Sequence, residues 1–424
     1  MGVFECGRYD RYTVAVNGTS KRPTPWWQRK GLDVIEGRLQ FAGCDAESLA
    51  REHGTPLYAY DPERLATNVG RLQAAFNRAQ VSHRVHYALK ANRRPEFLAR
   101  LRSLGNVGID ACSPQEVTLA LGAGWKPEEI SYTGTNLSER DLDVILAEPV
   151  ILNLDSLSAI RRVGRRAPGR AIGLRVNPQI GAGYSAQLTY AGDKPTKFGI
   201  YADRFDEALA LARDCSLEVQ GLHFHIGSGW LGPSLDTFLE ATKRGADLAS
   251  RVPQLRYFNV GGGLGIPLNA SEEKVDLDAY TQGIARHLGP LGVTVFTEPG
   301  DYVVKDAAIL LVEVVTVEEK GGVRFVGVDC GFNAFNLPAM YHLHQEIVLC
   351  RAADAPATMS CTVAGHINEA GDLFAEDCRL PDVREGDVLA LLNAGGYGAS
   401  MASHHCARPA ARELVIAAVP NAER

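Results

Sequence analysis

The chain has 424 residues, of which 46% are hydrophobic and 22% charged, with a formal net charge of −6 and a pI near 6.0. These values favour a globular protein of two domains and argue against nucleic acid as a partner. No apolar run reaches the roughly 20 residues of a membrane helix, and residues 1–22 lack the apolar core of a signal peptide. Nine cysteines without a CxxC pair indicate neither a zinc site nor a disulfide framework. We therefore expect a cytoplasmic protein that binds no membrane and no metal.

Residues 1–50 mix short strand-like pieces, such as 12–16, with a helix at 45–52. We expect this segment to contribute to a β domain. A strand at 57–60 and a helix at 62–78 follow, and strand and helix patterns then alternate. The expected strands are 85–89, 107–111, 130–133, 150–154, 171–176, 217–223, 257–260 and 294–297. Eight or nine such units predict an α/β fold, a (β/α)8 TIM-like barrel over residues 51–298, with an open doubly wound sheet as the alternative.

Residues 299–424 have a different pattern. β-rich runs are separated by Gly, Pro and Asp turns, at 307–317, 323–328, 345–350, 359–363, 388–392 and 413–418. Because little of this region has helical spacing, we predict a C-terminal all-β domain.

Lys90 ends the expected strand at 85–89, within Tyr-Ala-Leu-Lys-Ala-Asn. Parallel barrels keep their chemistry at the carboxyl ends of the strands, and a crowded lysine can attack a carbonyl. Most lysines at strand ends are solvated surface groups. A catalytic role for Lys90 is therefore supported only in combination with the other motifs.

Three further groups also follow strands. The run Gly261-Gly262-Gly263-Leu264-Gly265 suits a phosphate cradle or a tight barrel loop. His223 and His225 in His-Phe-His-Ile-Gly-Ser suit metal ligands, a ring stacked on a cofactor, or core histidines. Glu298, in Glu-Pro-Gly, suits a partner for a protonated ring nitrogen or a turn cap.

Two loops of the β domain are also candidates. The glycines around Tyr397 place one hydroxyl where it could reach a phosphate or pack a turn. The polar loop 365–372 suits a cleft lining or an interface. The pairs at 342/344 and 404/405 fit surface histidines better than metal ligands.

Taken in order, Tyr-Ala-Leu-Lys-Ala-Asn, His-Ile-Gly-Ser, Gly-Gly-Gly-Leu-Gly, Glu-Pro-Gly and Gly-Tyr-Gly resemble one family. From about Thr55 to about Ile416 the chain is similar to the fold-type III pyridoxal-phosphate decarboxylases, and among them to the diaminopimelate decarboxylases. The resemblance implies a carboxy-lyase with pyridoxal 5'-phosphate as cofactor and an amino acid as substrate. It also implies a homodimer with shared active sites.

The resemblance assigns roles to single residues. Lys90 would carry the cofactor and transfer protons, His225 would stack on its ring, and Glu298 would keep the ring nitrogen protonated. The other implied cofactor contacts are Asp110, Arg175, Ser228, Gly262, Gly263, Gly265 and Tyr397. The implied substrate contacts are Asp301, Tyr341, Asn368 and Glu369, with Asn368 at a catalytic position.

The sequence departs from the resemblance at the substrate positions. Asp301 stands where relatives have the arginine of Glu-Pro-Gly-Arg, and Leu337 stands where a second arginine is expected. Asn368 replaces the cysteine that helps to protonate the product. Losing two cations and gaining an anion disfavours a distal carboxylate, so we expect a substrate other than meso-diaminopimelate. The alternatives are diaminopimelate decarboxylase itself, an amino-acid racemase, which Glu298 disfavours, and a non-catalytic carrier of the cofactor.

Overall fold

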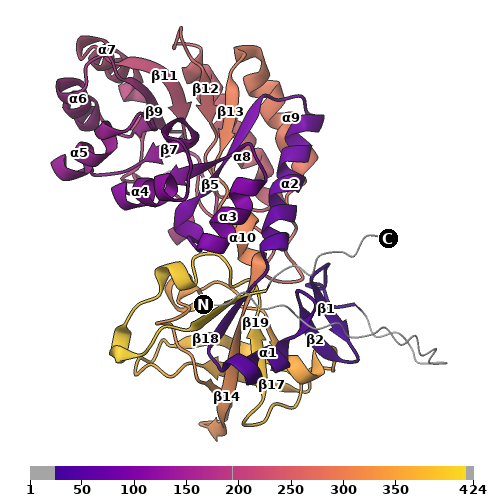
Figure 1. Cartoon of the computed structure of the whole chain (residues 1–424). Helices are drawn as coiled ribbons and strands as arrows, with labels where there is room; N and C mark the ends of the chain where they lie inside the picture. Colours follow the sequence, from indigo (N-terminus) through magenta and orange to yellow (C-terminus); the bar gives the residue numbers. More distant parts are fainter. Residues whose placement is uncertain (1–23, 193, 417–424) are drawn as a thin grey trace. The chain divides into compact units, whose positions relative to one another are not determined.

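The computed structural model describes residues 24–192 and 194–416, and these form two compact units (Figure 1). The barrel unit comprises Ala66–Pro267 and Glu273–Val304. The sheet unit comprises Leu268–Glu272 together with the described residues up to Leu65 and from Lys305 onward. Each unit is therefore assembled from segments that are far apart in the sequence. The strand-like piece expected at 12–16 lies outside the described residues.

Parallel strands close into a ring in the barrel unit. Each strand pairs with the next, and Thr297 of the last strand faces Val85 of the first, which closes the barrel. This confirms the predicted barrel and excludes the open sheet. Counted over the described residues, its eight strands are β5(His83–Ala88), β6(Val107–Ala111), β7(Ile130–Thr133), β8(Ile151–Leu154), β9(Ala171–Asn177), β11(Glu218–His223), β12(Tyr257–Asn259) and β13(Thr294–Thr297). A short strand that the sequence did not predict, β10(Ile200–Tyr201), pairs with β9.

Amphipathic helices surround these strands (Figure 1). In α6(Leu157–Arg166), Ile160 and Val163 are buried while Arg161 and Arg165 are exposed, which is the helical period expected of one apolar face. Ser156 caps this helix by accepting a hydrogen bond from the amide of Ala159. The other helices are α2(Pro62–Arg78), α3(Pro95–Ser103), α4(Pro114–Gly122), α5(Glu139–Ala147), α7(Phe205–Asp214), α8(Leu235–Ala249), α9(Leu277–Leu288) and the single turn α10(Asp301–Val304).

The sheet unit is built around β14(Ala308–Lys320). The first half of β14 is buried and pairs with β4(Leu57–Tyr60) and β19(Val388–Leu391), and the second half pairs with β15(Val323–Val328). The remaining strands of this sheet are β16(Ile347–Leu349), β17(Met359–Ala364), β18(Leu373–Leu380) and β20(Arg412–Val415). The strand at 57–60 therefore belongs to this sheet and not to the barrel. Its local pattern fits either sheet, and its partners β14 and β20 lie far away in the sequence.

A small antiparallel sheet completes the sheet unit. It contains β1(Leu32–Ile35), β2(Arg38–Phe41) and β3(Cys44–Asp45), and α1(Ala46–His53) follows. Leu39 and Phe41 pack into one core with Ile309 and Leu311 of β14. The two ends of the described chain, both rich in strands, therefore belong to the same sheet unit. A short helix, α11(Leu337–Tyr341), precedes β16.

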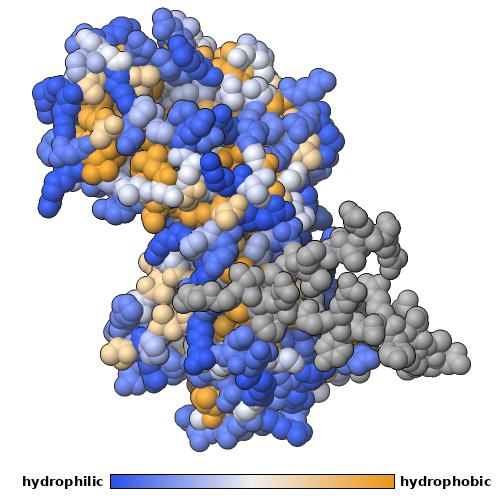
Figure 2. Space-filling model, in the orientation of Figure 1, coloured by the Kyte–Doolittle hydropathy of each residue, from blue (hydrophilic) through white to orange (hydrophobic). Residues whose placement is uncertain are grey.

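The outer faces of both units are mostly hydrophilic in the view of Figure 2. Among the described residues, no helix combines the length and the apolar character needed to cross a membrane.

Candidate active site

The polar residues singled out in the sequence gather where barrel strands end. Lys90 lies in the 3-10 turn Leu89–Ala91 directly after β5, Asp110 lies near the end of β6, and Glu298 follows β13. Because β6 and β13 are the two neighbours of β5, these three residues come from adjacent strands of one parallel barrel. Such an end of a barrel is where enzymes of this architecture bind and transform their ligands.

Lys90 forms an ion pair with Asp110. The Nζ atom of Lys90 lies 2.8 Å from Oδ2 of Asp110, and only 3% of the Asp110 surface is exposed. Burial and the charge of Glu298 raise the pKa of Asp110 to about 7, although Lys90 acts in the opposite direction. The sequence placed Asp110 among the cofactor contacts, and the structure places it beside the candidate catalytic amine.

This shift predicts a pH dependence of stability. Since the pKa of Asp110 in the folded chain, about 7, lies above its ordinary value of 3.8, folding favours the protonated carboxyl. Its stabilising contribution, a few kcal/mol, is therefore complete below about pH 4 and is lost as the pH rises through about 7. The free energy of unfolding of the cofactor-free protein can be measured in urea between pH 5 and 8. We expect it to vary less with pH in Asp110→Asn than in the wild type.

The control for this experiment is Asp203→Asn, which removes an exposed carboxyl of the same unit and should keep the wild-type profile. A profile for Asp110→Asn that matches the wild type would contradict the assignment.

The Glu298 carboxylate accepts three hydrogen bonds inside the barrel. The donors are Nε2 of His223 at 2.9 Å, Nδ2 of Asn259 at 2.5 Å and Oγ of Ser131 at 3.3 Å. Burial acts to raise the pKa of Glu298, but His223, Lys90 and Asn259 together hold it well below its ordinary value. Glu298 is therefore an ionised carboxylate fixed in one orientation, and not a turn cap.

His223 has a role that the sequence did not reveal. Its Nε2 atom donates to Glu298, while its Nδ1 atom has no hydrogen-bond partner among the described residues. Within residues 24–192 and 194–416, no group of three or more His, Cys, Asp or Glu side chains is arranged to hold a metal ion. Because β12 separates β11 from β13, nothing in the local sequence links His223 to Glu298.

Asn259 and Ser131 were also missed. Asn259 ends β12, and its Oδ1 atom accepts the amide of Gly261 at 2.9 Å. Ser131 in β7 accepts a hydrogen bond from Asn153, whose Oδ1 atom accepts the hydroxyl of Tyr257. Isolated Asn and Ser residues in strands carry no signal of their own, so only the closed barrel shows this network.

His225 has a buried ring nitrogen without a hydrogen-bond partner, and Arg175 is a buried cation without a direct ion pair, both among the described residues. His225 lies two residues beyond β11, its Nδ1 atom has no partner among the described residues, and its ring centroid is 5.3 Å from that of Tyr190. Arg175 is 7% exposed and packs over the ring of Phe198 at 4.6 Å. Over the described ranges no acidic side chain or hydrogen-bond acceptor pairs with Arg175. Burial lowers the pKa of Arg175, and the charges of Asp155, Glu298 and Asp110 oppose this without forming a direct ion pair. A buried cation in this setting suits an anionic or electron-rich ligand.

The glycine run forms a close approach of three backbone segments. Gly263 has a φ of +87°, and a Cβ atom there would lie 1.8 Å from the carbonyl oxygen of Gly227. The amides of Gly262 and Gly263 have no acceptor in the described part of the chain, so both can bind an anion. The amide of Gly265 is donated to Trp230 O at 3.0 Å, and Ser228 Oγ lies 3.4 Å from the Tyr190 hydroxyl.

Replacing Gly263 with alanine should damage this cradle. The new methyl group would force the Gly227 segment apart in a backbone conformation that L-residues avoid. We expect a cost of about 1–3 kcal/mol or more, seen as roughly 10- to 100-fold weaker binding of an anionic cofactor in a titration. The control is Gly289→Ala, where the added Cβ meets nothing within 4 Å. Equal affinities for the two variants would contradict this reading.

The remaining candidates lie on both units. Asp301 is buried at the start of α10 in the barrel unit. Tyr341, at the end of α11, and Tyr397 are half-buried residues of the sheet unit, and Tyr397 has a φ of +59°. Asn368 and Glu369 are exposed in the loop 365–372, where Glu369 lies 3.3 Å from His405. The predicted contacts of these four sheet-unit residues with cofactor or substrate stay predictions.

Comparison with known proteins identifies the family. Residues 66–305 match the model of the pyridoxal-dependent decarboxylases, pyridoxal binding domain. Diaminopimelate decarboxylase of Methanothermobacter thermautotrophicus is 40% identical over 395 residues, covering 90% of this chain and 91% of the relative. The enzyme of the same name from Escherichia coli K12 is 32% identical over 397 residues, covering 88% and 91%.

Solved structures agree. Diaminopimelate decarboxylase from Helicobacter pylori, complexed with L-lysine, superposes with a TM-score of 0.81 at 32% identity, covering 88% of this chain and 94% of that one. The lysine decarboxylase of Selenomonas ruminantium, at 24% identity and a TM-score of 0.76, shares the fold. The chain belongs to the pyridoxal-dependent decarboxylase family, whose members are carboxy-lyases that use pyridoxal phosphate.

Proposed function

We propose that this protein decarboxylates an amino acid whose distal end is cationic or neutral, so that meso-diaminopimelate is not its preferred substrate. One observation carries the decarboxylase part of the proposal. An amine, Lys90, and an ionised carboxylate that accepts three hydrogen bonds, Glu298, follow adjacent strands at the same end of the barrel.

The barrel residues fit pyridoxal phosphate. The free amides of Gly262 and Gly263, with Ser228, would hold its phosphate. Lys90 would bind its aldehyde carbon, and the Glu298 carboxylate would accept a hydrogen bond from its ring nitrogen. When bound, the cofactor supplies a positively charged ring that accepts the electron pair released as carbon dioxide leaves.

The remaining barrel residues position these groups. His225, whose own Nδ1 atom has no hydrogen-bond partner among the described residues, would lie against the flat face of the cofactor ring. Arg175 would contact an anionic or electron-rich atom of the ligand. Asp110 would orient the Lys90 amine through the ion pair already present. Asn368 is a poor acid, so Lys90, His225 or a water molecule would supply the final proton.

Glu298 also separates the competing reactions. A carboxylate at the ring nitrogen keeps that nitrogen protonated, which favours loss of carbon dioxide, whereas racemases of this scaffold pair the nitrogen with arginine. A non-catalytic carrier would not need the sheet unit, whose exposed loop 365–372 is suited to approach a second subunit. The expected homodimer, with Tyr341, Asn368, Glu369 and Tyr397 at a shared site, is part of this proposal.

The proposed substrate preference rests on Asp301 and Leu337. Both are buried, and neither can pair with a carboxylate. By analogy with broken buried ion pairs, a distal carboxylate without its arginine is disfavoured by about 3–5 kcal/mol. A substrate with an amine, a guanidine or a neutral group at its distal end avoids that cost.

The experiment is carbon dioxide release from the purified, cofactor-loaded protein with meso-diaminopimelate, lysine, ornithine, arginine and glutamate. We expect turnover with an amino acid of cationic or neutral distal group and a kcat/KM for diaminopimelate that is lower by roughly 100-fold or more. Diaminopimelate decarboxylase activity is the second candidate, favoured by the names of relatives that share up to 40% of their residues. Efficient turnover of diaminopimelate would establish it in place of our proposal.

A further inference from the structure

Two cysteines face each other in the sheet unit, outside the barrel site. Cys361 in β17 is the direct antiparallel partner of Cys378 in β18. Met359 pairs with Leu380 one repeat away, and both are buried, so the two thiols project from the inner face of this hairpin. Directly opposed residues in an antiparallel pair have Cα atoms about 4.5–5.5 Å apart, within the range that a disulfide spans.

The Cys361 thiol already contacts Cys378. Cys361 Sγ lies 3.6 Å from the carbonyl oxygen of Cys378. A hydrogen bond between the thiols lowers the pKa of Cys361 and raises that of Cys378. A thiolate is the form that reacts with oxidants, so this arrangement favours reaction at the pair over an isolated buried thiol such as Cys350, whose pKa burial raises.

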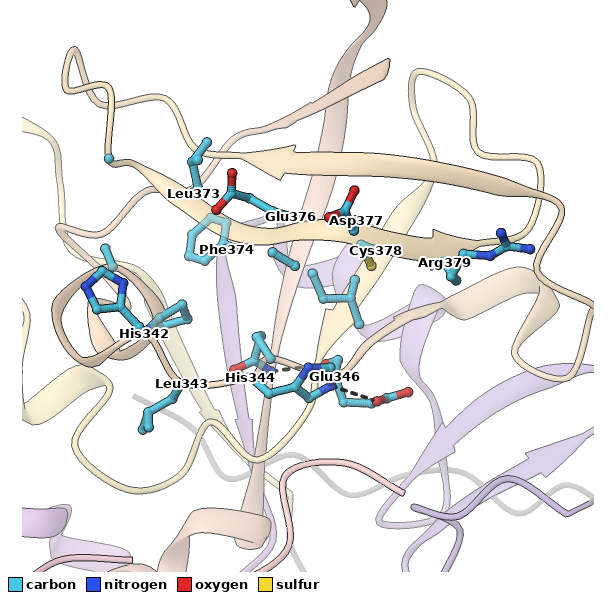
Figure 3. A pocket seen from close by; sticks show the side chains of 16 residues that line it. His342, Leu343, His344, Glu346, Leu373, Phe374, Glu376, Asp377, Cys378 and Arg379 are labelled. Carbon is cyan, nitrogen blue, oxygen red and sulfur yellow. Dashed lines mark hydrogen bonds and ion pairs between the residues drawn. The ribbon is translucent and has the colours of Figure 1, made fainter. Parts of the chain in front are cut away.

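A cavity of about 700 Å³ gives access to Cys378. It is bordered by α11, the segment leading into β16, and β18, and Cys378 is one of the side chains that line it (Figure 3). Cys361 itself is 3% exposed. An oxidant that enters the cavity therefore meets Cys378 first, and Cys361 lies directly opposite it on the neighbouring strand.

We propose that Cys361 and Cys378 form a reversible oxidation site whose co-substrate is hydrogen peroxide or a small-molecule disulfide. With peroxide, one thiolate attacks an oxygen atom, giving a sulfenic acid and, after proton transfer, water. The second sulfur then displaces hydroxide from the sulfenic sulfur, which leaves as a second water molecule once protonated. Both cysteines are oxidised, one peroxide is reduced to two waters, and one S–S bond forms. With a small-molecule disulfide, one thiolate attacks a sulfur atom and releases the first thiol, and the second cysteine then displaces the other thiol from the mixed disulfide, so that one S–S bond forms as another is reduced.

The S–S bond would join the two strands of the β17–β18 hairpin, whose loop carries two of the predicted site residues. β17 and β18 are connected by the loop 365–372, which carries Asn368 and Glu369. Asp372 anchors this loop by accepting the amides of Ile367 and Phe332 at 2.7 and 2.6 Å. An S–S bond between Cys361 and Cys378 would fix the two strands that support the loop, so amide exchange along β17 and β18 should slow on oxidation. This inference does not depend on the substrate of the enzyme.

The test uses the full-length, cofactor-loaded protein, first reduced and then treated with hydrogen peroxide or oxidised glutathione. Free thiols are blocked with N-ethylmaleimide under denaturing conditions, and the digest is analysed by mass spectrometry. We expect a peptide pair joined through Cys361 and Cys378, two fewer maleimide adducts per chain, and recovery of both adducts with dithiothreitol.

Cys361→Ser and Cys378→Ser should each abolish the joined peptide, and Cys378→Ser, at a half-exposed position, guards against a folding defect of the buried variant. Cys406→Ser, at an exposed cysteine of the same unit, should retain it. No intramolecular bond, a bond between other cysteines, persistence of the bond in either variant, or oxidation to sulfinic acid without a disulfide would each overturn the proposal.

Discussion

Exchanging Glu298 for glutamine is expected to leave the protein folded and able to bind pyridoxal phosphate but to lower kcat by about 10²- to 10³-fold. Glutamine has nearly the same shape and can keep the contact with Asn259, so the barrel should tolerate it. It cannot carry the negative charge that keeps a ring nitrogen protonated, and the electron pair released by the substrate then has no charged acceptor.

Carbon dioxide release and the visible absorbance of the bound cofactor measure the two properties separately. Glu128→Gln is the matched control, since Glu128 is an exposed carboxylate of the same unit. Turnover of Glu298→Gln close to that of the wild type would remove Glu298 from the proposed reaction. Loss of cofactor binding in this variant would instead show that Glu298 is needed to hold the ligand.

Replacing Lys90 with alanine should have a still larger effect, roughly 10⁴-fold or more on kcat/KM. The variant loses the amine that binds the cofactor and moves protons, and it leaves the 3%-exposed carboxyl of Asp110 without its cation. Burial and Glu298 already raise the pKa of Asp110, and without Lys90 they should raise it further, so we expect this carboxyl to be protonated at neutral pH.

Borohydride reduction followed by intact-mass analysis is the direct measurement. The wild type should retain the cofactor covalently and Lys90→Ala should not, while Lys243→Ala, at an exposed lysine of α8, should behave as the wild type. A covalent adduct on Lys90→Ala would show that another amine binds the cofactor.

Local patterns were sufficient to predict the barrel and the positions of two candidate residues in it. Buried strand runs followed by amphipathic helices predicted the ring of strands, and the rule that parallel strands end together placed Lys90 and Glu298 at one end of it. The patterns gave less information in the sheet unit. β18 was not predicted, because Glu376 and Asp377 interrupt its alternation where the register shifts.

The hydrogen bonds around Glu298 could not be predicted in this way. His223 is neither near it in sequence nor on a neighbouring strand, and strand alternation gives a side chain's face but not its partner. The same limit applies to β4, whose four buried residues suit either sheet until β14 and β20 are in place. Contacts between distant segments depend on the closed fold, and in this chain they set the charge of the site.

The pairing of β13 with β5 has a consequence for how the protein matures. Lys90 is synthesised early, but Glu298 and the strand that closes the ring emerge only after most of the barrel unit has left the ribosome. A nascent chain that stops before β13 has Lys90 and its ion-pair partner Asp110 but lacks Glu298, and it leaves the edges of β5 and β12 unpaired. Under the roles proposed for Lys90 and Glu298, the complete cofactor site therefore forms only when the last barrel strand has been synthesised.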